Sequence, residues 1–178
     1  MEEQPLPTAA ELDRVATADF MRLVAPLFED APGLAARLAP QRPFGTDDRL
    51  LDAIRRAARQ MPEEDQLRLL NAHPRIGADR EAMSALSRSE QGEADGAGGA
   101  TGSLAEKLEM LNAAYEQRFG FRFVIFVGGR SRSEMVPLLE NALRRSRREE
   151  LRRGLDDVVR IAGDRLRRLR RAPEAPAR

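Results

Sequence analysis

Only one stretch of this sequence has the composition of a β-strand. The run Phe121-Arg122-Phe123-Val124-Ile125-Phe126-Val127 is rich in aromatic and β-branched residues. A strand must pair its backbone N–H and C=O groups with a neighbour, and the chain contains no second run of this kind. The sequence therefore predicts an all-α fold that carries residues 121–127 as one isolated extended segment, with backbone hydrogen-bonding groups left for another partner.

The rest of the chain follows helical periodicity. Apolar residues three and four positions apart, bounded by capping residues, proline or glycine, predict a single domain of about seven or eight helices. The longest expected helix runs from Ser146 to about Leu169 and begins with the capping box Ser146-Arg147-Arg148-Glu149. The predicted organisation is a flexible N-terminal segment (residues 1–15), the helical domain (residues 16–170) and a disordered tail (residues 171–178).

Composition excludes several functional classes. The 178 residues include no cysteine and one histidine, which argues against thiolate chemistry and the usual histidine-rich metal sites. The 30 basic and 29 acidic residues nearly cancel, so the chain lacks the positive excess of a dedicated nucleic-acid binder. No apolar run reaches the roughly 18 residues of a membrane span, and no signal sequence opens the chain. We therefore expect a cytoplasmic protein that holds no metal and binds neither nucleic acid nor a membrane.

The only histidine lies in the motif Asn71-Ala72-His73-Pro74-Arg75-Ile76-Gly77. Because the residue before a proline is disfavoured in the α region, His73 is expected at or just past the end of a helix, on a rigid turn. Two interpretations are open: an imidazole that bonds nearby carbonyls, or a general acid or base. Position alone favours the first.

Arg165 is the one arginine that periodicity places inside the apolar face of the last helix, between Val158 and Ile161. A buried guanidinium requires an anion, which is either a buried acidic side chain or a substrate carboxylate. Periodicity leaves both alternatives open.

The remaining arginines near the helix end are interpreted as a solvated cluster that complements the helix dipole, with RNA contact as the weaker alternative. They are Arg167, Arg168, Arg170 and Arg171.

The segment Ser87-Arg88-Ser89-Glu90 has the form of a capping box, which explains Ser87 and Glu90 without any ligand. Gln91 has no such local explanation. Combined with His73, Arg165 and the extended segment, these groups would form a metal-free acid/base site for a small, anionic, amide-rich molecule.

Six motifs, in this order along most of the chain, resemble the OHCU decarboxylase family, which acts on 2-oxo-4-hydroxy-4-carboxy-5-ureidoimidazoline (OHCU). They are LFEDAPGLAARLAPQRPF (27–44), LLNAHPRIG (69–77), SRSEQ (87–91), LNAAYEQRFGFRFVIFV (111–127), GRSRSEM (129–135) and VVRIAGDRL (158–166). The resemblance implies an all-α fold and cofactor-free decarboxylation of OHCU to S-allantoin in urate catabolism.

The resemblance also implies which residues form the site. The catalytic residues would be His73, Glu90 and Arg165. The substrate would contact Pro74, Ser87, Glu90, Gln91 and Arg165, and main-chain atoms of Phe123, Val124, Ile125, Phe126 and Val127. As partners it implies the small-molecule substrate and functional coupling to urate oxidase and hydroxyisourate hydrolase, and it allows a homodimer.

The chain departs from the family pattern in two places. Ala142 and Arg145 stand where the family usually has an arginine and an asparagine, and residues 92–102 form a longer, glycine-rich loop. These differences bear on helix packing and on enclosure of the substrate. Two other functions remain as alternatives: a non-catalytic ureide-binding protein of the same fold, and a helical module that binds RNA or an acidic protein through its basic last helix.

Overall fold

The computed structural model describes residues 5–29, 31–78, 87 and 102–170. This part of the chain contains eight α-helices, two 3-10 helices and no β-strand, which confirms the all-α prediction. The α-helices are α1 (Ala9–Leu12), α2 (Thr17–Val24), α3 (Pro32–Leu38), α4 (Asp47–Gln60), α5 (Glu63–Ala72), α7 (Gly102–Phe119), α8 (Arg132–Ala142) and α9 (Arg147–Arg170). The 3-10 helices are η1 (Ala25–Phe28) and η2 (Ala39–Gln41). None of the described helices is both long and apolar enough to cross a bilayer.

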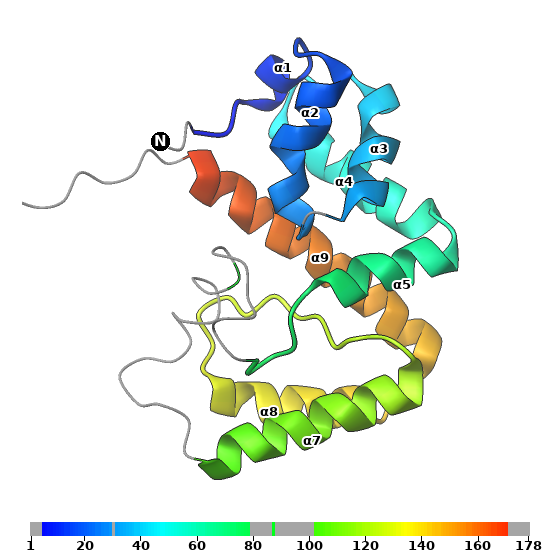
Figure 1. Cartoon of the computed structure of the whole chain (residues 1–178), viewed down its shortest axis with the longest axis vertical. Helices are drawn as coiled ribbons and strands as arrows, with labels where there is room; N and C mark the ends of the chain where they lie inside the picture. The colour runs from blue at the N-terminus through cyan, green and yellow to red at the C-terminus, as the bar shows by residue number, and fades with distance from the viewer. Residues whose placement is uncertain (1–4, 30, 79–86, 88–101, 171–178) are drawn as a thin grey trace, which may run out of the picture.

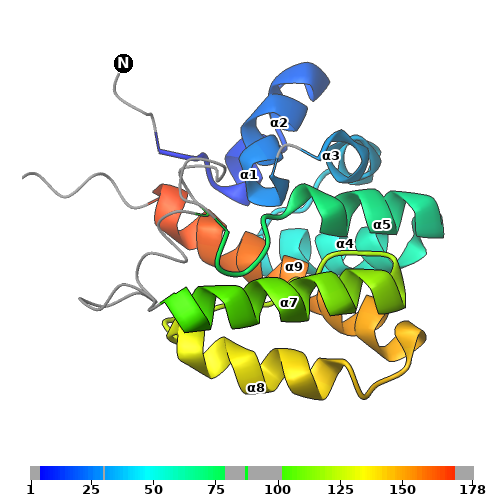
Figure 2. The ribbon, with the colours of Figure 1, turned by 60° about the horizontal axis from the view of Figure 1, so that its bottom comes forward.

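Helix α9 is the axis of the fold. It runs diagonally through the molecule, with α1 to α4 around its C-terminal half and α7 and α8 around its N-terminal half (Figure 1). It packs against α4, η1 and α5, while α7 and α8 lie side by side, as the rotated view in Figure 2 also shows. The contact with α5 is close: a Cβ atom on Gly154 would lie 3.1 Å from Leu70 Cδ2. The apolar face of α9 is therefore buried along its length.

The N-terminal segment is packed from residue 6 onward, although the sequence predicts flexibility for residues 1–15. Thr8 and Glu11 form a capping box that starts α1. The Leu6 N–H donates to the Leu169 carbonyl over 2.9 Å, and the Leu6 and Leu12 side chains are buried. The cap, the buried side chains and the backbone bond to α9 thus contribute to holding residues 6–15, together with bonds from Arg42 to the Leu12 and Val15 carbonyls. Residues 1–4 and the predicted tail 171–178 lie outside the described residues.

The extended segment is held by side chains instead of a neighbouring strand. Arg153 Nη1 donates to the Val124 carbonyl and Arg130 Nη1 donates to the Phe126 carbonyl, each over 2.8 Å. The Phe126 N–H faces the Asp157 carboxylate and acts to lower its pKa. Arg153 and Asp157 both belong to α9, so one helix supplies polar contacts that a sheet would otherwise provide.

The backbone of Ile125 differs from that of its neighbours. In an extended chain, successive residues turn their N–H and C=O groups to opposite sides. Since Val124 and Phe126 turn theirs toward the side chains just described, Ile125 turns its groups the other way. Within the described part of the chain, no protein group bonds the Ile125 N–H or C=O. The sequence predicts unpaired backbone groups throughout residues 121–127. In the structure, side chains contact the backbone of Val124 and Phe126, and the Ile125 N–H and C=O between them face the other side.

The side chains behind the segment form a buried network. Arg153 donates to Glu150 and to Asp157, each over 2.8 Å, and its guanidinium lies 4.6 Å from the centre of the Phe123 ring. Tyr115 donates to the same Glu150, which is fully buried. Burial raises the pKa of Asp157. The network therefore depends on the charge of Arg153.

Of the departures from the family pattern, Arg145 contacts this network. Arg145 makes a longer contact of 3.4 Å to Glu150. Ala142 is buried at the end of α8. Residues 92–101 of the glycine-rich loop lie outside the described residues.

We predict that Arg153→Gln lowers the free energy of unfolding by about 3 kcal/mol, because the only positive charges that then remain beside the two buried carboxylates, among the described residues, make the longer contacts of Arg145 and Arg160. Urea denaturation measures the change. The matched control is Arg152→Gln on the exposed side of α9, which should change stability by less than about 0.5 kcal/mol. Equal effects of the two substitutions would contradict the assigned role of the network.

Candidate active site

A cleft lies where the end of α5, the extended segment and α9 meet. It has about 490 Å³ of empty space, counting the part that is open to solvent. Its lining residues are His73, Pro74, Ile76, Ser87, Phe123, Val124, Ile125, Phe126, Val127, Gly128, Gly129, Ile161, Asp164 and Arg168. The cleft brings together His73, Pro74, Ser87 and residues 123–127, all of which the sequence predicts as site residues. Glu90 and Gln91 lie outside the described residues, and Arg165 does not line the cleft.

His73 occupies the predicted position just past the end of α5. It is the C-cap residue, with extended backbone angles (φ −72°, ψ 143°). Arg122, at the start of the extended segment, donates from its backbone to Asn71 over 2.9 Å and from its side chain to the His73 carbonyl over 2.8 Å. The histidine turn and the extended segment are therefore fastened to each other.

The tautomer of His73 follows from its contacts. Its Nδ1 lies 3.0 Å from the Leu69 carbonyl, which can only accept, so we assign the proton to Nδ1 and the lone pair to Nε2. The residue is only 3% exposed, and Nε2 has no hydrogen-bond partner among the described residues. A buried nitrogen lone pair is thus available at the wall of the cleft.

Burial lowers the pKa of His73 to about 4, and the positive charge of Arg165 contributes in the same direction. The imidazole is therefore neutral at any pH well above this value. At neutral pH it can accept a proton at Nε2 but cannot begin a reaction as a proton donor.

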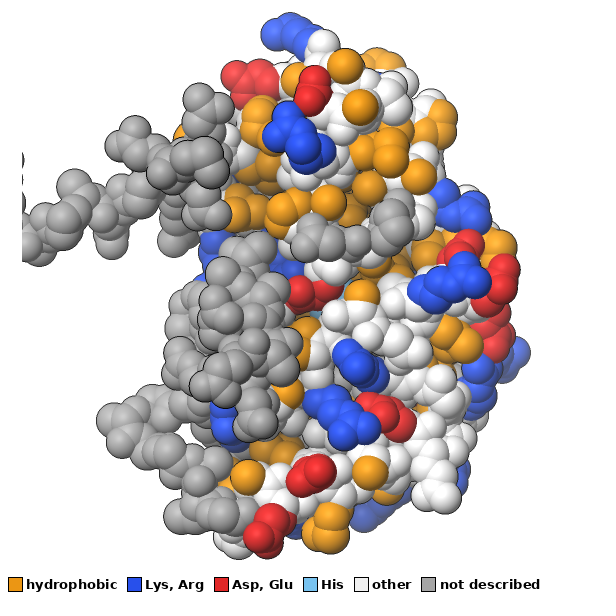
Figure 3. Space-filling view, viewed as in Figure 1, with side chains coloured by type: hydrophobic (Ala, Val, Ile, Leu, Met, Phe, Trp, Pro, Cys, Tyr) orange, Lys and Arg blue, Asp and Glu red, His pale blue; other side chains and the backbone are white. Residues whose placement is uncertain are grey.

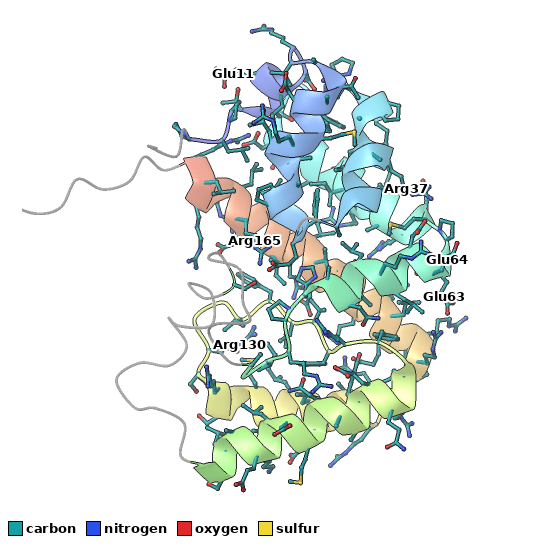
Figure 4. The ribbon with its side chains drawn as sticks, viewed as in Figure 1. Glu11, Arg37, Glu63, Glu64, Arg130 and Arg165 are labelled. Carbon is teal, nitrogen blue, oxygen red and sulfur yellow. The ribbon has the colours of Figure 1, made fainter. Side chains whose placement is uncertain are left out.

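Arg165 forms a buried ion pair with Glu29. Its Nη2 contacts a Glu29 carboxylate oxygen and donates to Ser87 Oγ over 3.0 Å, while Nη1 donates to the Pro26 carbonyl over 3.1 Å. Ser87 donates to the same Glu29 oxygen. Figure 4 shows Arg165 in the middle of the molecule, on α9. The sequence leaves open whether Arg165 pairs with a buried acidic side chain or with a substrate carboxylate. The structure shows the pair with the buried Glu29. Arg165 contacts the wall of the cleft only indirectly, through its hydrogen bond to Ser87, among the described residues.

Glu29 is a site residue that the sequence does not reveal. It ends η1 in the left-handed region (φ 51°, ψ 40°), which is uncommon for a residue other than glycine. Its partner Arg165 lies far away in sequence, and no helical pattern includes it. The one available signal is its place inside the first motif, LFEDAPGLAARLAPQRPF.

The end of α9 is not the solvated cluster that the sequence predicts. Arg168 lines the cleft and donates from Nε to Asp164 over 2.6 Å. Arg170 donates to the Pro7 carbonyl over 3.0 Å and pairs with Asp47. Arg168 is therefore held by an acidic residue of its own helix, and Arg170 helps to hold the N-terminal segment against α9. Only Arg167 is largely exposed, and Arg171 lies outside the described residues.

Charged and apolar surfaces alternate on this side of the molecule. Figure 3 shows basic and acidic side chains meeting between an upper and a lower group of hydrophobic side chains, beside the residues drawn in grey. The described wall of the cleft combines both kinds: apolar side chains from the extended segment and α9, and the polar groups of His73, Ser87, Asp164 and Arg168.

We predict that the imidazole of the folded protein titrates near pH 4, well below the usual value of about 6.5. Because His73 is the only histidine, its ring carbon and nitrogen NMR signals are assigned without ambiguity. The nitrogen shifts should also report the Nδ1–H tautomer. The urea-unfolded chain is the control and should titrate near 6.5. A folded-state midpoint near 6.5 would show that the ring is not desolvated as described.

Comparison with known proteins identifies the family of this chain. Residues 13–167 match the family model for OHCU decarboxylase. A 2-oxo-4-hydroxy-4-carboxy-5-ureidoimidazoline decarboxylase of Haloferax volcanii is 33% identical over 159 residues, covering 89% of this chain and 94% of the relative. A uric acid degradation bifunctional protein of a Bacillus species is 27% identical, over 92% of this chain but only 32% of that protein. The crystal structure of an OHCU decarboxylase in the presence of (S)-allantoin has a TM-score of 0.65 and 25% identity, covering 77% of this chain and 89% of that one. The chain belongs to the OHCU decarboxylase family.

Proposed function

We propose that this protein decarboxylates OHCU to S-allantoin. The observation that carries the proposal is a neutral, buried imidazole whose Nε2 lone pair lies at a cleft next to the Ile125 N–H and C=O, which no described residue bonds. The name of the Haloferax relative gives the same reaction, and the related crystal structure was obtained with S-allantoin. Decarboxylation at this site needs a proton acceptor and a precise orientation of the substrate, and the cleft offers both.

The chemistry requires few external groups. The carbon that carries the carboxylate also carries a hydroxyl and adjoins a C=N bond of the ring. When the carbon–carbon bond breaks, CO2 leaves and the electron pair moves into the ring, where a ring nitrogen takes up one proton. The resulting enol becomes the ring carbonyl of allantoin when its hydroxyl loses a proton and the neighbouring carbon gains one. The substrate thus provides its own electron sink.

His73 moves the proton in this last step. Its Nε2 accepts the hydroxyl proton, and the imidazolium then donates a proton to the neighbouring ring carbon. Because one ring at one wall delivers this proton, it arrives on a single face of the substrate and one enantiomer forms. The Nδ1 bond to Leu69 keeps the ring oriented in both protonation states.

Other groups orient the substrate. The Ile125 N–H and C=O offer a donor and an acceptor side by side, which match the C=O and N–H groups of a cyclic urea. From the resemblance, we assign Glu90 and Gln91 to the ureido amides. Arg165 and Glu29 fix Ser87 at the wall and act on substrate position through it.

The remaining expectations are also proposals. The Bacillus relative, named for uric acid degradation, supports coupling to urate oxidase and hydroxyisourate hydrolase. A cytoplasmic location and a homodimer stay predictions. No observation favours the RNA-binding alternative, since Arg170 bonds the Pro7 carbonyl within the protein and Arg168 lines the cleft.

We predict that His73→Asn and His73→Gln each lower kcat by about 10² to 10⁴, the usual contribution of a general base. The asparagine amide can still donate to Leu69 and so keeps the structural bond while removing the base. Circular dichroism of OHCU generated in situ measures the appearance of S-allantoin, and thermal unfolding checks the fold.

Full activity of His73→Asn would show that His73 is not the general base and has a structural role only. A wild-type protein that binds S-allantoin but never accelerates decay of OHCU would favour the non-catalytic ureide-binding alternative.

A further inference from the structure

We propose that Arg168, held by Asp164, recognises the substrate carboxylate that the reaction removes. This inference rests on the proposed function and assigns a specificity residue to it. Among the cleft-lining residues in the described ranges, Arg168 is the one with a positively charged side chain, because His73 is neutral. A cleft that admits an anionic substrate needs such a group to replace the water that the carboxylate loses.

The other polar groups of the described wall do not fit this task. Asp164 carries a negative charge and by itself would repel a carboxylate. Ser87 donates its hydroxyl proton to Glu29, and Arg165 does not line the cleft. Pairing with Arg168 and Arg167 neutralises Asp164, at 2.6 and 3.2 Å respectively. The position beside Arg168 is therefore the one where a carboxylate is stabilised.

Asp164 also positions Arg168. The two residues are one helical turn apart on α9, and the bond from Arg168 Nε to Asp164 fixes the plane of the guanidinium at the wall. A fixed guanidinium loses little freedom when it binds a carboxylate. Asp164 is thus a positioning residue for this contact.

A moderate attraction suits a decarboxylase. The carboxylate leaves as neutral CO2, so a strong bond to it would stabilise the bound substrate more than the transition state and slow the reaction. Arg168 is 32% exposed, and Asp164 shares its charge, so its attraction for an anion is weakened by water and by its partner. S-allantoin has no carboxylate and loses this contact. Arg168 therefore discriminates substrate from product.

Arg167 provides a matched control. It lies on the same helix and bonds the same Asp164, but its side chain is 62% exposed and does not line the cleft. Replacing either arginine removes one positive charge and one bond to Asp164. Only the replacement of Arg168 removes a cation from the cleft wall.

The test compares Arg168→Gln, Arg168→Lys and Arg167→Gln in the OHCU assay, with S-allantoin as a competitive inhibitor. We expect Arg168→Gln to raise KM about fivefold without lowering kcat, and to leave the inhibition constant of S-allantoin unchanged. Arg168→Lys keeps the charge and should recover part of the lost affinity for OHCU. Arg167→Gln should leave all three constants within about twofold of wild type.

Two results would overturn the proposal: an unchanged KM in Arg168→Gln, or an equal loss of affinity for OHCU and for S-allantoin. The second would mean that Arg168 only shapes the cleft. If the wild type itself fails to convert OHCU, the proposed function fails, and carboxylate recognition is tested by binding alone. Wild type should then bind hydantoin-5-acetic acid more tightly than hydantoin, and Arg168→Gln should bind the two equally; no preference in the wild type would overturn the inference.

Discussion

The ion pair between Arg165 and Glu29 determines how three distant parts of the chain meet. It joins the end of η1 to the C-terminal part of α9 and, through shared bonds to Ser87, it fixes a residue of the cleft wall. A buried ion pair adds little net stability, because both charges lose water. Its value here is register: α9 has one axial position at which Arg165 meets Glu29. The charges of the pair also act on His73 in opposite directions, so their placement sets how readily the imidazole takes a proton.

The parts of the molecule that could be predicted are those set by local rules. Pro74 determines where His73 stands, and the period of α9 turns Arg165 inward. The absence of a partner for residues 121–127 indicates the fold class. The apolar periodicity does not indicate helix α8, because Pro137 interrupts its pattern. Ser131 and Glu134 nevertheless form a capping box at its start.

The parts that could not be predicted depend on tertiary contacts. Glu29 lies in a short 3-10 turn with no periodicity, and its partner is more than a hundred residues away. Arg168 falls beside the apolar stripe of α9, where a charged residue is ordinarily solvated. Only the fold shows that the polar border of the helix forms a wall of the cleft. A helical pattern distinguishes buried from exposed positions and has no signal for a position that faces a ligand.

The alternation along the extended segment has a consequence for how this site can change over time. If the backbone of Ile125 recognises the ligand, the side chain at that position is free to vary without altering the recognition, and proline is the main substitution that would remove a donor. Specificity for the ring would then depend on the conformation of the main chain. Side chains of Arg153, Asp157 and Arg130 contact that main chain at the neighbouring residues Val124 and Phe126. Substitutions in that supporting layer, outside the cleft, would be the ones that retune which cyclic ureas the protein accepts.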